Sequence, residues 1–243
     1  MIQEPKIVNG KVVPKRKKRK QYSWYGILYN NGNFRCGGCY IGGRAFLTAA
    51  HCVDGISDPT KLSVKFNNYL RTGGGTVVKA KKIYIHPNYN RNTFDNDVAV
   101  ICLEKKPIKV RTMRLNDSAI RTNIGRKMSV IGYGRTSERG PLSDKPRQIN
   151  IKVSTRENYP SEWITSQMFT ASDVNDPGNP NDNEDSCQGD SGSPAFVYLK
   201  KKRQYRAVGI VSWGIGCAMD GFPGVYSKVS SFRKWIIQTR RKC

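Results

Sequence analysis

Short apolar stretches, several of which alternate with polar positions, recur along the chain between turn residues. A period of two places successive side chains on opposite faces of a β-strand. Many short strands at such intervals indicate an antiparallel barrel or sandwich. The predicted strands cover residues 24–29, 62–66, 76–85, 98–103, 128–131, 148–153, 195–199, 207–213 and 224–229.

The end of the chain has a different period. Phe232, Trp235 and Ile236 lie at helical spacing after a serine, which predicts a serine-capped helix over residues 230–241. Residues 105–125 carry few strand signals and divide the predicted strands into two sets. This division indicates a crossover between two barrels.

The composition indicates a folded but strongly basic protein. The chain has 243 residues, of which 37% are hydrophobic, enough for a real core. Its 42 Lys and Arg residues against 18 Asp and Glu residues give a net charge of +24. Such a charge attracts nucleic acid, sulfated glycans or anionic membrane surfaces, and composition does not choose among them. Part of it lies in the run KRKKRK at residues 15–20.

Seven cysteines are spread widely along the chain. The pair Cys36-x-x-Cys39 has no second CxxC, and the chain has only two histidines, so the spacing is not that of a zinc site. We expect no metal and no cofactor. Spread cysteines in a chain of this size favour disulfides and an oxidising compartment, and an odd number leaves at least one thiol without an internal partner.

Two kinds of targeting signal are absent from the sequence. No apolar run approaches the roughly 20 residues of a membrane-spanning helix. Residues 1–6 are too short and too polar for a signal peptide. If the protein is secreted, we expect its signal to have been removed from this sequence.

Three residues are candidates for histidine-based chemistry. His51 lies in FLTAAHC, whereas His86 precedes a proline in YIHPNY and is typical of a structural turn. Asp97, in FDNDVAV, leads into an apolar strand, where a buried carboxylate needs a partner such as a histidine N–H. Ser191, in CQGDSGSP, has glycines nearby that let the backbone approach a substrate and leave N–H groups for an oxyanion.

The motifs KIVNG, LTAAHC, DNDVAV, DSCQGDSGSP and VSWGIGCA…PGVY resemble those of the chymotrypsin-type (trypsin-like) serine proteases. They occur in that family's order and spacing over almost the whole chain. The resemblance implies an all-β fold of two six-stranded antiparallel β-barrels packed together with a C-terminal α-helix. It implies a residual activation peptide at 1–6 and a protease domain at 7–243, with a first barrel at about 20–104, a crossover at 105–125, a second barrel at about 126–229 and the helix at 230–241.

The resemblance also implies a catalytic triad. Ser191 Oγ would attack the scissile carbonyl, His51 would take and return the proton, and Asp97 would hold the imidazole. The N–H groups of Gly189 and Ser191 would form the oxyanion hole.

The same resemblance implies specificity for Lys or Arg. Asp185 lies six residues before Ser191, where the trypsin branch carries a pocket aspartate, and Gly214 and Gly224 would keep the pocket open. A carboxylate at the base of a pocket binds cationic side chains by charge and hydrogen bonding. The remaining predicted substrate-binding residues are Ser186, Gln188, Ser212 and Trp213.

A zymogen is expected as well. In the family, cleavage before the Ile-Val pair frees an α-amino group that pairs with the aspartate before the nucleophile. Here the cut would fall between Lys6 and Ile7, and the partner would be Asp190.

Two disulfides follow from the resemblance, Cys36–Cys52 and Cys187–Cys217. Two other family bridges are missing, since Thr155, Thr170, Met128 and Val197 stand at those positions. The remaining cysteines have no family assignment: we consider a Cys39–Cys102 pair, and Cys243 is a candidate for an intermolecular bridge.

The leading hypothesis is a secreted trypsin-like serine endopeptidase acting on proteins or peptides, with protein inhibitors as further partners. The basic surface, including residues 11–20, would dock heparin-like sulfated glycans or other polyanions. One alternative is a polyanion-binding pseudoprotease that acts without proteolysis. Another is a nuclear or nucleic-acid-binding protein, but the cysteine pattern and the lack of a DNA-reading motif argue against nucleic acid as a specific partner.

Overall fold

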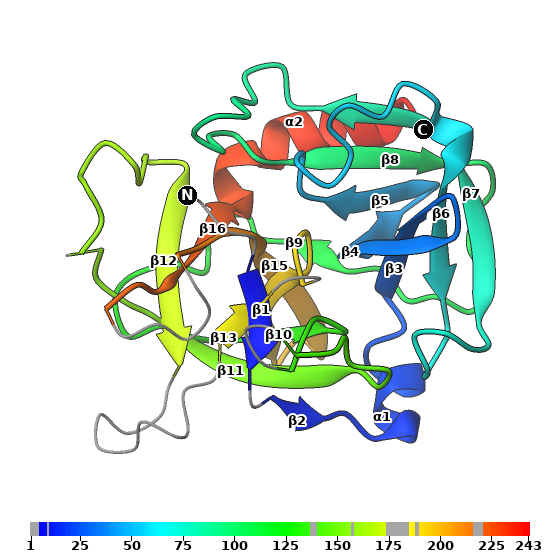
Figure 1. Cartoon of the computed structure of the whole chain (residues 1–243), viewed down its shortest axis with the longest axis horizontal. Helices are drawn as coiled ribbons and strands as arrows, with labels where there is room; N and C mark the ends of the chain where they lie inside the picture. The colour runs from blue at the N-terminus through cyan, green and yellow to red at the C-terminus, as the bar shows by residue number, and fades with distance from the viewer. Residues whose placement is uncertain are drawn as a thin grey trace.

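The computed structural model describes residues 5–8, 10–136, 140–156, 158–173, 185–187, 190–215 and 221–243. It confirms the predicted pair of six-stranded antiparallel barrels, which Figure 1 shows side by side. The first barrel closes in the order β3-β4-β5-β8-β7-β6. The second runs β10-β14-β15-β16-β12-β11 and closes through the pairing of β10 with β11.

The strands of the first barrel are β3 (Tyr25–Asn30), β4 (Asn33–Gly42), β5 (Ala45–Thr48), β6 (Leu62–Phe66), β7 (Thr76–Ile85) and β8 (Ala99–Leu103). Those of the second are β10 (Lys127–Gly132), β11 (Arg147–Val153), β12 (Met168–Asp173), β14 (Pro194–Leu199), β15 (Gln204–Trp213) and β16 (Gly224–Lys228). The remaining elements are β1 (Pro5–Val8), β2 (Lys11–Val12), α1 (Lys15–Lys20), η1 (Pro59–Lys61), β9 (Arg114–Leu115), β13 (Asp185–Cys187) and α2 (Val229–Arg241).

The predicted alternation is clearest in β6. Leu62, Val64 and Phe66 are fully buried, while the residues between them are half-exposed. Strand β4 was not predicted, because Gly37 and Gly38 inside it are typical of turns. The barrel requires glycine there, since a Cβ on Gly38 would lie 2.4 Å from the Phe46 ring. Strands β5 and β12 were also missed.

The second barrel replaces its missing family bridges by packing and hydrogen bonding. Met128 is buried in the core of this barrel, and Val197 packs against that core. The Thr170 hydroxyl donates a hydrogen bond to the carbonyl of Ser154 at 2.9 Å. Since neither pair of positions contains a cysteine, neither leaves a thiol without its partner.

The C-terminal helix α2 covers one end of the molecule, as Figure 1 shows. It begins at Val229 after Lys228, which makes no side-chain cap, so the predicted serine cap is wrong. Its buried residues Val229, Phe232 and Ile236 recur at helical spacing, which explains why the helix itself was predictable.

A disulfide joins Cys102 in β8 to Cys243. Both predictions for these cysteines are therefore wrong: Cys102 does not pair with Cys39, and Cys243 does not form an intermolecular bridge. Cys39 is a free, buried thiol whose pKa is raised by burial. Because Cys102 and Cys243 are 141 residues apart in the sequence, their pairing depends on how α2 packs.

The basic run at residues 15–20 forms the helix α1 on the surface near β2 and β11 (Figure 1). Its Lys18 is fully buried, which corrects the prediction that the whole run is a surface patch. The Lys18 ammonium donates to the carbonyls of Tyr22 at 3.3 Å and Tyr25 at 3.4 Å. Burial lowers the pKa of Lys18 from 10.5 to about 7.

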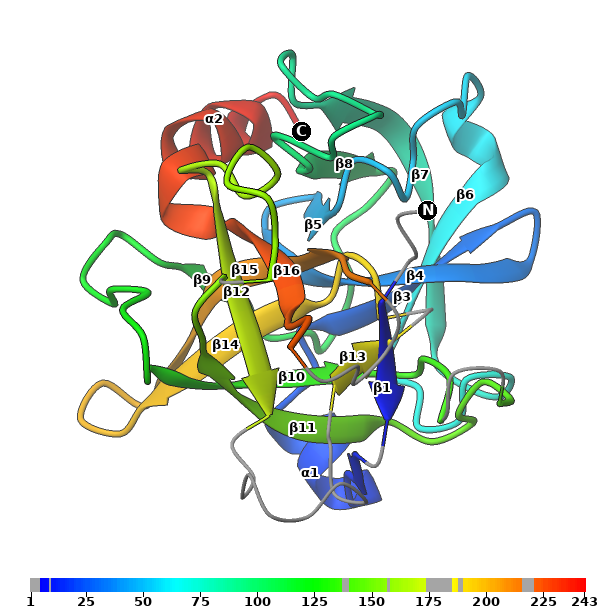
Figure 2. The same ribbon diagram turned by 60° about the vertical axis from the view of Figure 1, so that its left-hand side comes forward.

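Strand β1 pairs antiparallel with β13, and both views in Figures 1 and 2 place the two side by side. Val8 lies opposite Asp185 and Pro5 opposite Cys187. The segment that contains Lys6 and Ile7 therefore lies against the strand that contains the predicted pocket aspartate. Within the described ranges, no helix has the length and apolar character needed to cross a membrane.

Candidate active site

His51 and Asp97 form a close pair where strand β5 of the first barrel ends and strand β8 begins. His51 lies in the turn after β5, and Asp97 lies just before β8. Since β5 and β8 are neighbouring antiparallel strands, the end of one lies beside the start of the other. His51 Nδ1 lies 2.8 Å from Asp97 Oδ2, and the His51 backbone N–H donates to Asp97 Oδ1 at 2.9 Å. Both carboxylate oxygens thus fix the position of the histidine.

Asp97 is fully buried, where a carboxylate is costly unless it is hydrogen-bonded. The Ser212 hydroxyl also donates to Asp97 Oδ2, and the Ser227 hydroxyl donates to the Asp97 carbonyl. These two serines come from β15 and β16 of the second barrel. The predicted substrate-strand residue Ser212 therefore also helps to hold the aspartate.

Ser191 lies in the turn just before β14 of the second barrel. Its carbonyl accepts from Gly37 N–H of β4 at 2.9 Å. A Cβ on the next residue, Gly192, would lie 2.1 Å from Thr48 Oγ1, three residues before His51. The Ser191 hydroxyl is buried and finds no hydrogen-bond partner among the residues that the structure describes. The fold thus places the loop that carries this buried hydroxyl against β4 and against the end of β5, which leads into the histidine turn.

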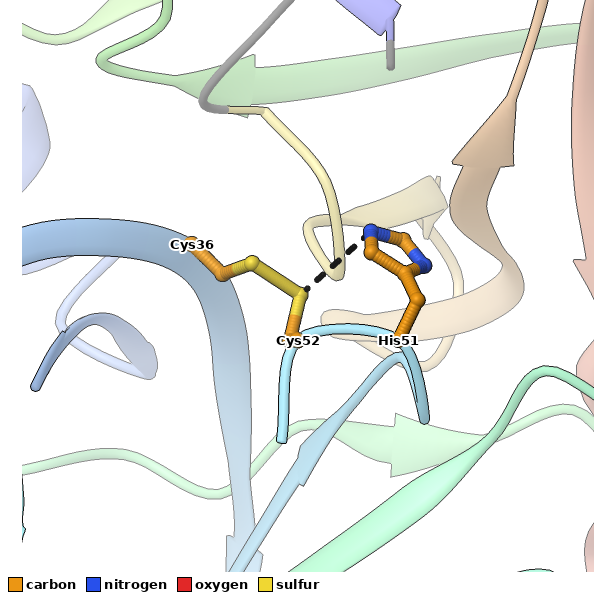
Figure 3. Close-up of side chains that lie close together, drawn as sticks. All are labelled: Cys36, His51 and Cys52. Carbon is orange, nitrogen blue, oxygen red and sulfur yellow. Dashed lines mark hydrogen bonds between the residues drawn. A yellow bond between two sulfur atoms is a disulfide. The ribbon is translucent and has the colours of Figure 1, made fainter. Parts of the chain in front are cut away.

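A disulfide joins Cys36 to Cys52 beside His51, as Figure 3 shows. His51 Nε2 lies 3.7 Å from Cys52 Sγ. The three side chains bring their possible metal-ligand atoms within 4.8 Å of one another. Because each sulfur is bonded to the other, neither is a thiolate ligand. The cluster therefore braces the histidine turn.

Phe94 is a site residue that the sequence analysis missed. Its ring meets the His51 ring edge-on, with centroids 5.6 Å apart. Its φ of 55° is uncommon for a bulky side chain, a strain that clusters at functional sites. The only sequence signal is an isolated aromatic residue within a polar loop three residues before Asp97.

The predicted substrate strand ends in an aromatic cluster. Trp213 is buried against Tyr159, at 5.4 Å between ring centroids, and Trp163, at 6.4 Å. Gly214 follows Trp213 directly, and Gly224 begins the neighbouring strand β16; both glycines are buried. The sequence analysis did not identify Tyr159 or Trp163, which lie in a loop before β12.

Asp190 is fully buried one residue before Ser191. Gly134 N–H donates to Asp190 Oδ1 at 3.0 Å. The Asp190 carbonyl accepts from the Ser193 N–H, and the Ser193 hydroxyl lies 3.3 Å from the Tyr25 hydroxyl. Burial, followed by the nearby Asp190 charge, raises the pKa of Tyr25. A buried carboxylate therefore lies under the loop that carries the nucleophile candidate.

Gln188, Gly189 and Cys217 lie outside the described residues, so the oxyanion hole and the Cys187–Cys217 bridge stay predictions. For Asp185, Ser186, Lys6 and Ile7, only the strands in which they lie are described.

His86 has the structural role that its motif predicted. Its ring contacts Phe232 and Trp235 of α2 edge-on, at 5.3 and 5.0 Å between centroids. Burial lowers its pKa. Within the described ranges, His51 is the one histidine of the two that forms an ion pair with a carboxylate.

Comparison with known proteins gives a consistent result. Residues 7–236 match the family model described as Trypsin. The chain is 35% identical to cationic trypsin-3 of Rattus norvegicus, a match that covers 88% of this chain and 83% of the relative. It is 33% identical to trypsin alpha-4 of Lucilia cuprina, covering 89% and 82%. It is 32% identical to trypsin Blo t 3 of Blomia tropicalis, covering 87% and 79%.

Proposed function

Because the chain belongs to the trypsin family of serine proteases, we propose that it is a secreted endopeptidase that cleaves proteins or peptides after Lys or Arg. The observation that carries this proposal is the His51–Asp97 pair, with Ser191 on the facing barrel. An imidazole oriented by a buried carboxylate is the base that a serine nucleophile needs.

The proposed mechanism assigns one proton to each step. His51 Nε2 takes the proton of Ser191 Oγ as the oxygen attacks the scissile carbonyl, and then gives it to the leaving amine. Asp97 accepts from Nδ1 and stabilises the imidazolium that forms. A water molecule then attacks the acyl-enzyme, and His51 takes its proton and returns it to Ser191 Oγ as the acyl group leaves. The N–H groups of Gly189 and Ser191 would bind the oxyanion, and losing one such donor typically costs about 10²–10³ in rate.

Specificity for cationic side chains is proposed from Asp185, with Ser186, Gln188, Gly214 and Gly224 as further pocket residues. The position of Asp185 in β13 supports the proposal, since this strand leads toward the loop that carries Ser191. A pocket carboxylate would pair with a substrate guanidinium or ammonium.

We propose that cleavage between Lys6 and Ile7 activates the enzyme. In the intact chain, both residues lie in β1, paired with β13. After cleavage, the new α-amino group of Ile7 would pair with the buried carboxylate of Asp190. That ion pair would order the loop around Ser191.

A polyanion such as a heparin-like glycan is proposed as an additional partner. The net charge of +24 supports this, because it exceeds what solubility of a domain requires. Binding of this kind weakens steeply with salt.

One experiment tests the protease proposal. The chain is cleaved at Lys6–Ile7 and assayed with an arginyl amide, beside a Ser191→Ala variant treated in the same way. Activity in the first and none in the second supports a protease. Absence of activity in both, with intact folding, would favour the non-proteolytic alternative.

A further inference from the structure

The helix α1 presents four exposed cations, from Lys15, Arg16, Arg19 and Lys20. They line a groove of about 890 Å³, which we call the α1 groove. Its other side is formed by the start of β7 and by the crossover. The groove residues beyond α1 are Asn67, Gly75, Thr76 and Lys109.

The cations of the α1 groove have no anionic partner in the described part of the chain. The lining contains five basic side chains and no carboxylate. The ion pairs within the described ranges join His51 to Asp97, Arg91 to Asp54 and Arg206 to Asp117, and none involves the groove.

This arrangement opposes the formation of α1. Lys15 and Arg19, and likewise Arg16 and Lys20, lie four residues apart, where like charges repel on a helix. The helix has six residues, no side-chain cap and no acidic residue in its first turn. Short helices of this kind are marginal by themselves, so tertiary contacts must hold it.

Buried Lys18 supplies such a contact. Its ammonium donates to two backbone carbonyls, at Tyr22 and Tyr25, and lies 5.4 Å from the centre of the Tyr25 ring. Lys17 reaches toward the second barrel, where it donates to Gln148 Oε1 at 3.4 Å. With these two side chains fixed, the remaining four cations project together toward the α1 groove.

We propose that the α1 groove is the binding site for a sulfated glycosaminoglycan chain. Arginine pairs with two oxygens of such an anionic group at once, and several cations in one groove match a ligand with repeated charges. The lining residues include no aliphatic or aromatic residue that could anchor an apolar side chain, whereas acidic peptides gain much of their affinity from such anchors. The proposal gives a place to the polyanion part of the proposed function and rests on it.

The test measures heparin oligosaccharide binding to the full chain at several salt concentrations. A Ser191→Ala background prevents self-digestion. The site variant is Arg16→Gln with Arg19→Gln, since glutamine keeps helix propensity. The matched control is Lys201→Gln with Lys202→Gln, which removes two equally exposed charges from the turn between β14 and β15.

We expect the site variant to bind at least about tenfold more weakly near physiological salt. The slope of log affinity against log salt should fall by about 1.5, because two ionic contacts are lost. The control should change both quantities by less than half as much. Circular dichroism and thermal unfolding establish that both variants keep the fold.

Three results would overturn the inference, each in a different way. Equal losses in both variants would show diffuse charge attraction without an α1 site. Equally tight binding of a polyglutamate peptide, with the same dependence on Arg16 and Arg19, would make the occupant an acidic peptide. If the protein with an unaltered α1 groove elutes from heparin at near-physiological salt, the polyanion part of the proposed function is wrong as well. The protease part is tested independently by the amide assay.

Discussion

Replacing Lys18 by methionine should stabilise the folded protein at neutral pH, although it removes two hydrogen bonds. The folded state lowers the pKa of Lys18 from 10.5 to about 7, through burial. At about 1.4 kcal/mol for each pH unit, this fall corresponds to roughly 5 kcal/mol of cost when the amine is protonated in the unfolded state. The two lost hydrogen bonds offset roughly 1–3 kcal/mol of that cost. The expected net gain is about 2–4 kcal/mol near pH 7.

The gain should depend on pH in a defined direction. Between pH 7 and 10.5 the unfolded chain holds a proton on Lys18 that the folded chain lacks, so the stability of the unaltered protein rises with pH through this window. Below about pH 7 both states are protonated, and the cost is fully present. The advantage of Lys18→Met should therefore shrink by roughly 3 kcal/mol between pH 7 and 9.5.

Urea unfolding at pH 6.5, 7.5, 8.5 and 9.5, followed by tryptophan fluorescence, measures this difference. Both proteins carry Ser191→Ala so that self-digestion does not interfere. Lys20→Met is the matched control, because Lys20 is an exposed residue of the same helix. The reasoning is refuted if Lys18→Met is less stable than its parent at pH 6.5 and 7.5, or if the difference between them does not change with pH.

Three further predictions concern the site and the C-terminus. Asp97→Asn should lower kcat by about 10⁴, the loss known for this exchange in the Ser-His-Asp triad, with urea stability measured alongside to exclude unfolding. Gly134→Ala places a Cβ 2.2 Å from Asp190 Oδ2, so it should lower amidase activity by up to about 100-fold, whereas a change below twofold would contradict the role of Asp190. Removing the Cys102–Cys243 bridge, which spans 141 residues, by a double alanine substitution should cost about 3–5 kcal/mol in urea unfolding, and an unchanged midpoint would contradict it.

The strands were the most predictable part of the fold. Residues 62–66 and 76–85 have the predicted bounds, because alternation directly reflects one buried face and one exposed face. Strand β4 escaped prediction because its glycines are needed for contacts that no local pattern contains: Gly38 packs against the Phe46 ring, and Gly37 against the hydroxyls of Tyr25 and Ser193. The resemblance to a known family identified the pair of barrels, which the periodicity alone left open as barrel or sandwich.

Site residues that lie in recognisable motifs were predictable, whereas those defined only by packing were not. His51 and Asp97 lie in recognisable segments, and the structure brings them together at 2.8 Å. Phe94 carries little signal in the sequence, since its role arises from a ring contact across a turn. The burial of Lys18 likewise has no signal in the sequence, because the run of cations that contains Lys18 predicts a solvated face. Only its packing around Tyr22 and Tyr25 shows otherwise.

The central claim is that Ser191 becomes a nucleophile through His51 and Asp97 once the chain is cut at Lys6–Ile7. Labelling with an arginine-like phosphonate, read out by mass spectrometry of the intact and digested protein, tests it most directly. The account predicts one label per cleaved chain, on Ser191, and little labelling of uncut protein or of cleaved Asp97→Asn. Absence of label on cleaved, folded protein, or a label on another residue, would contradict it.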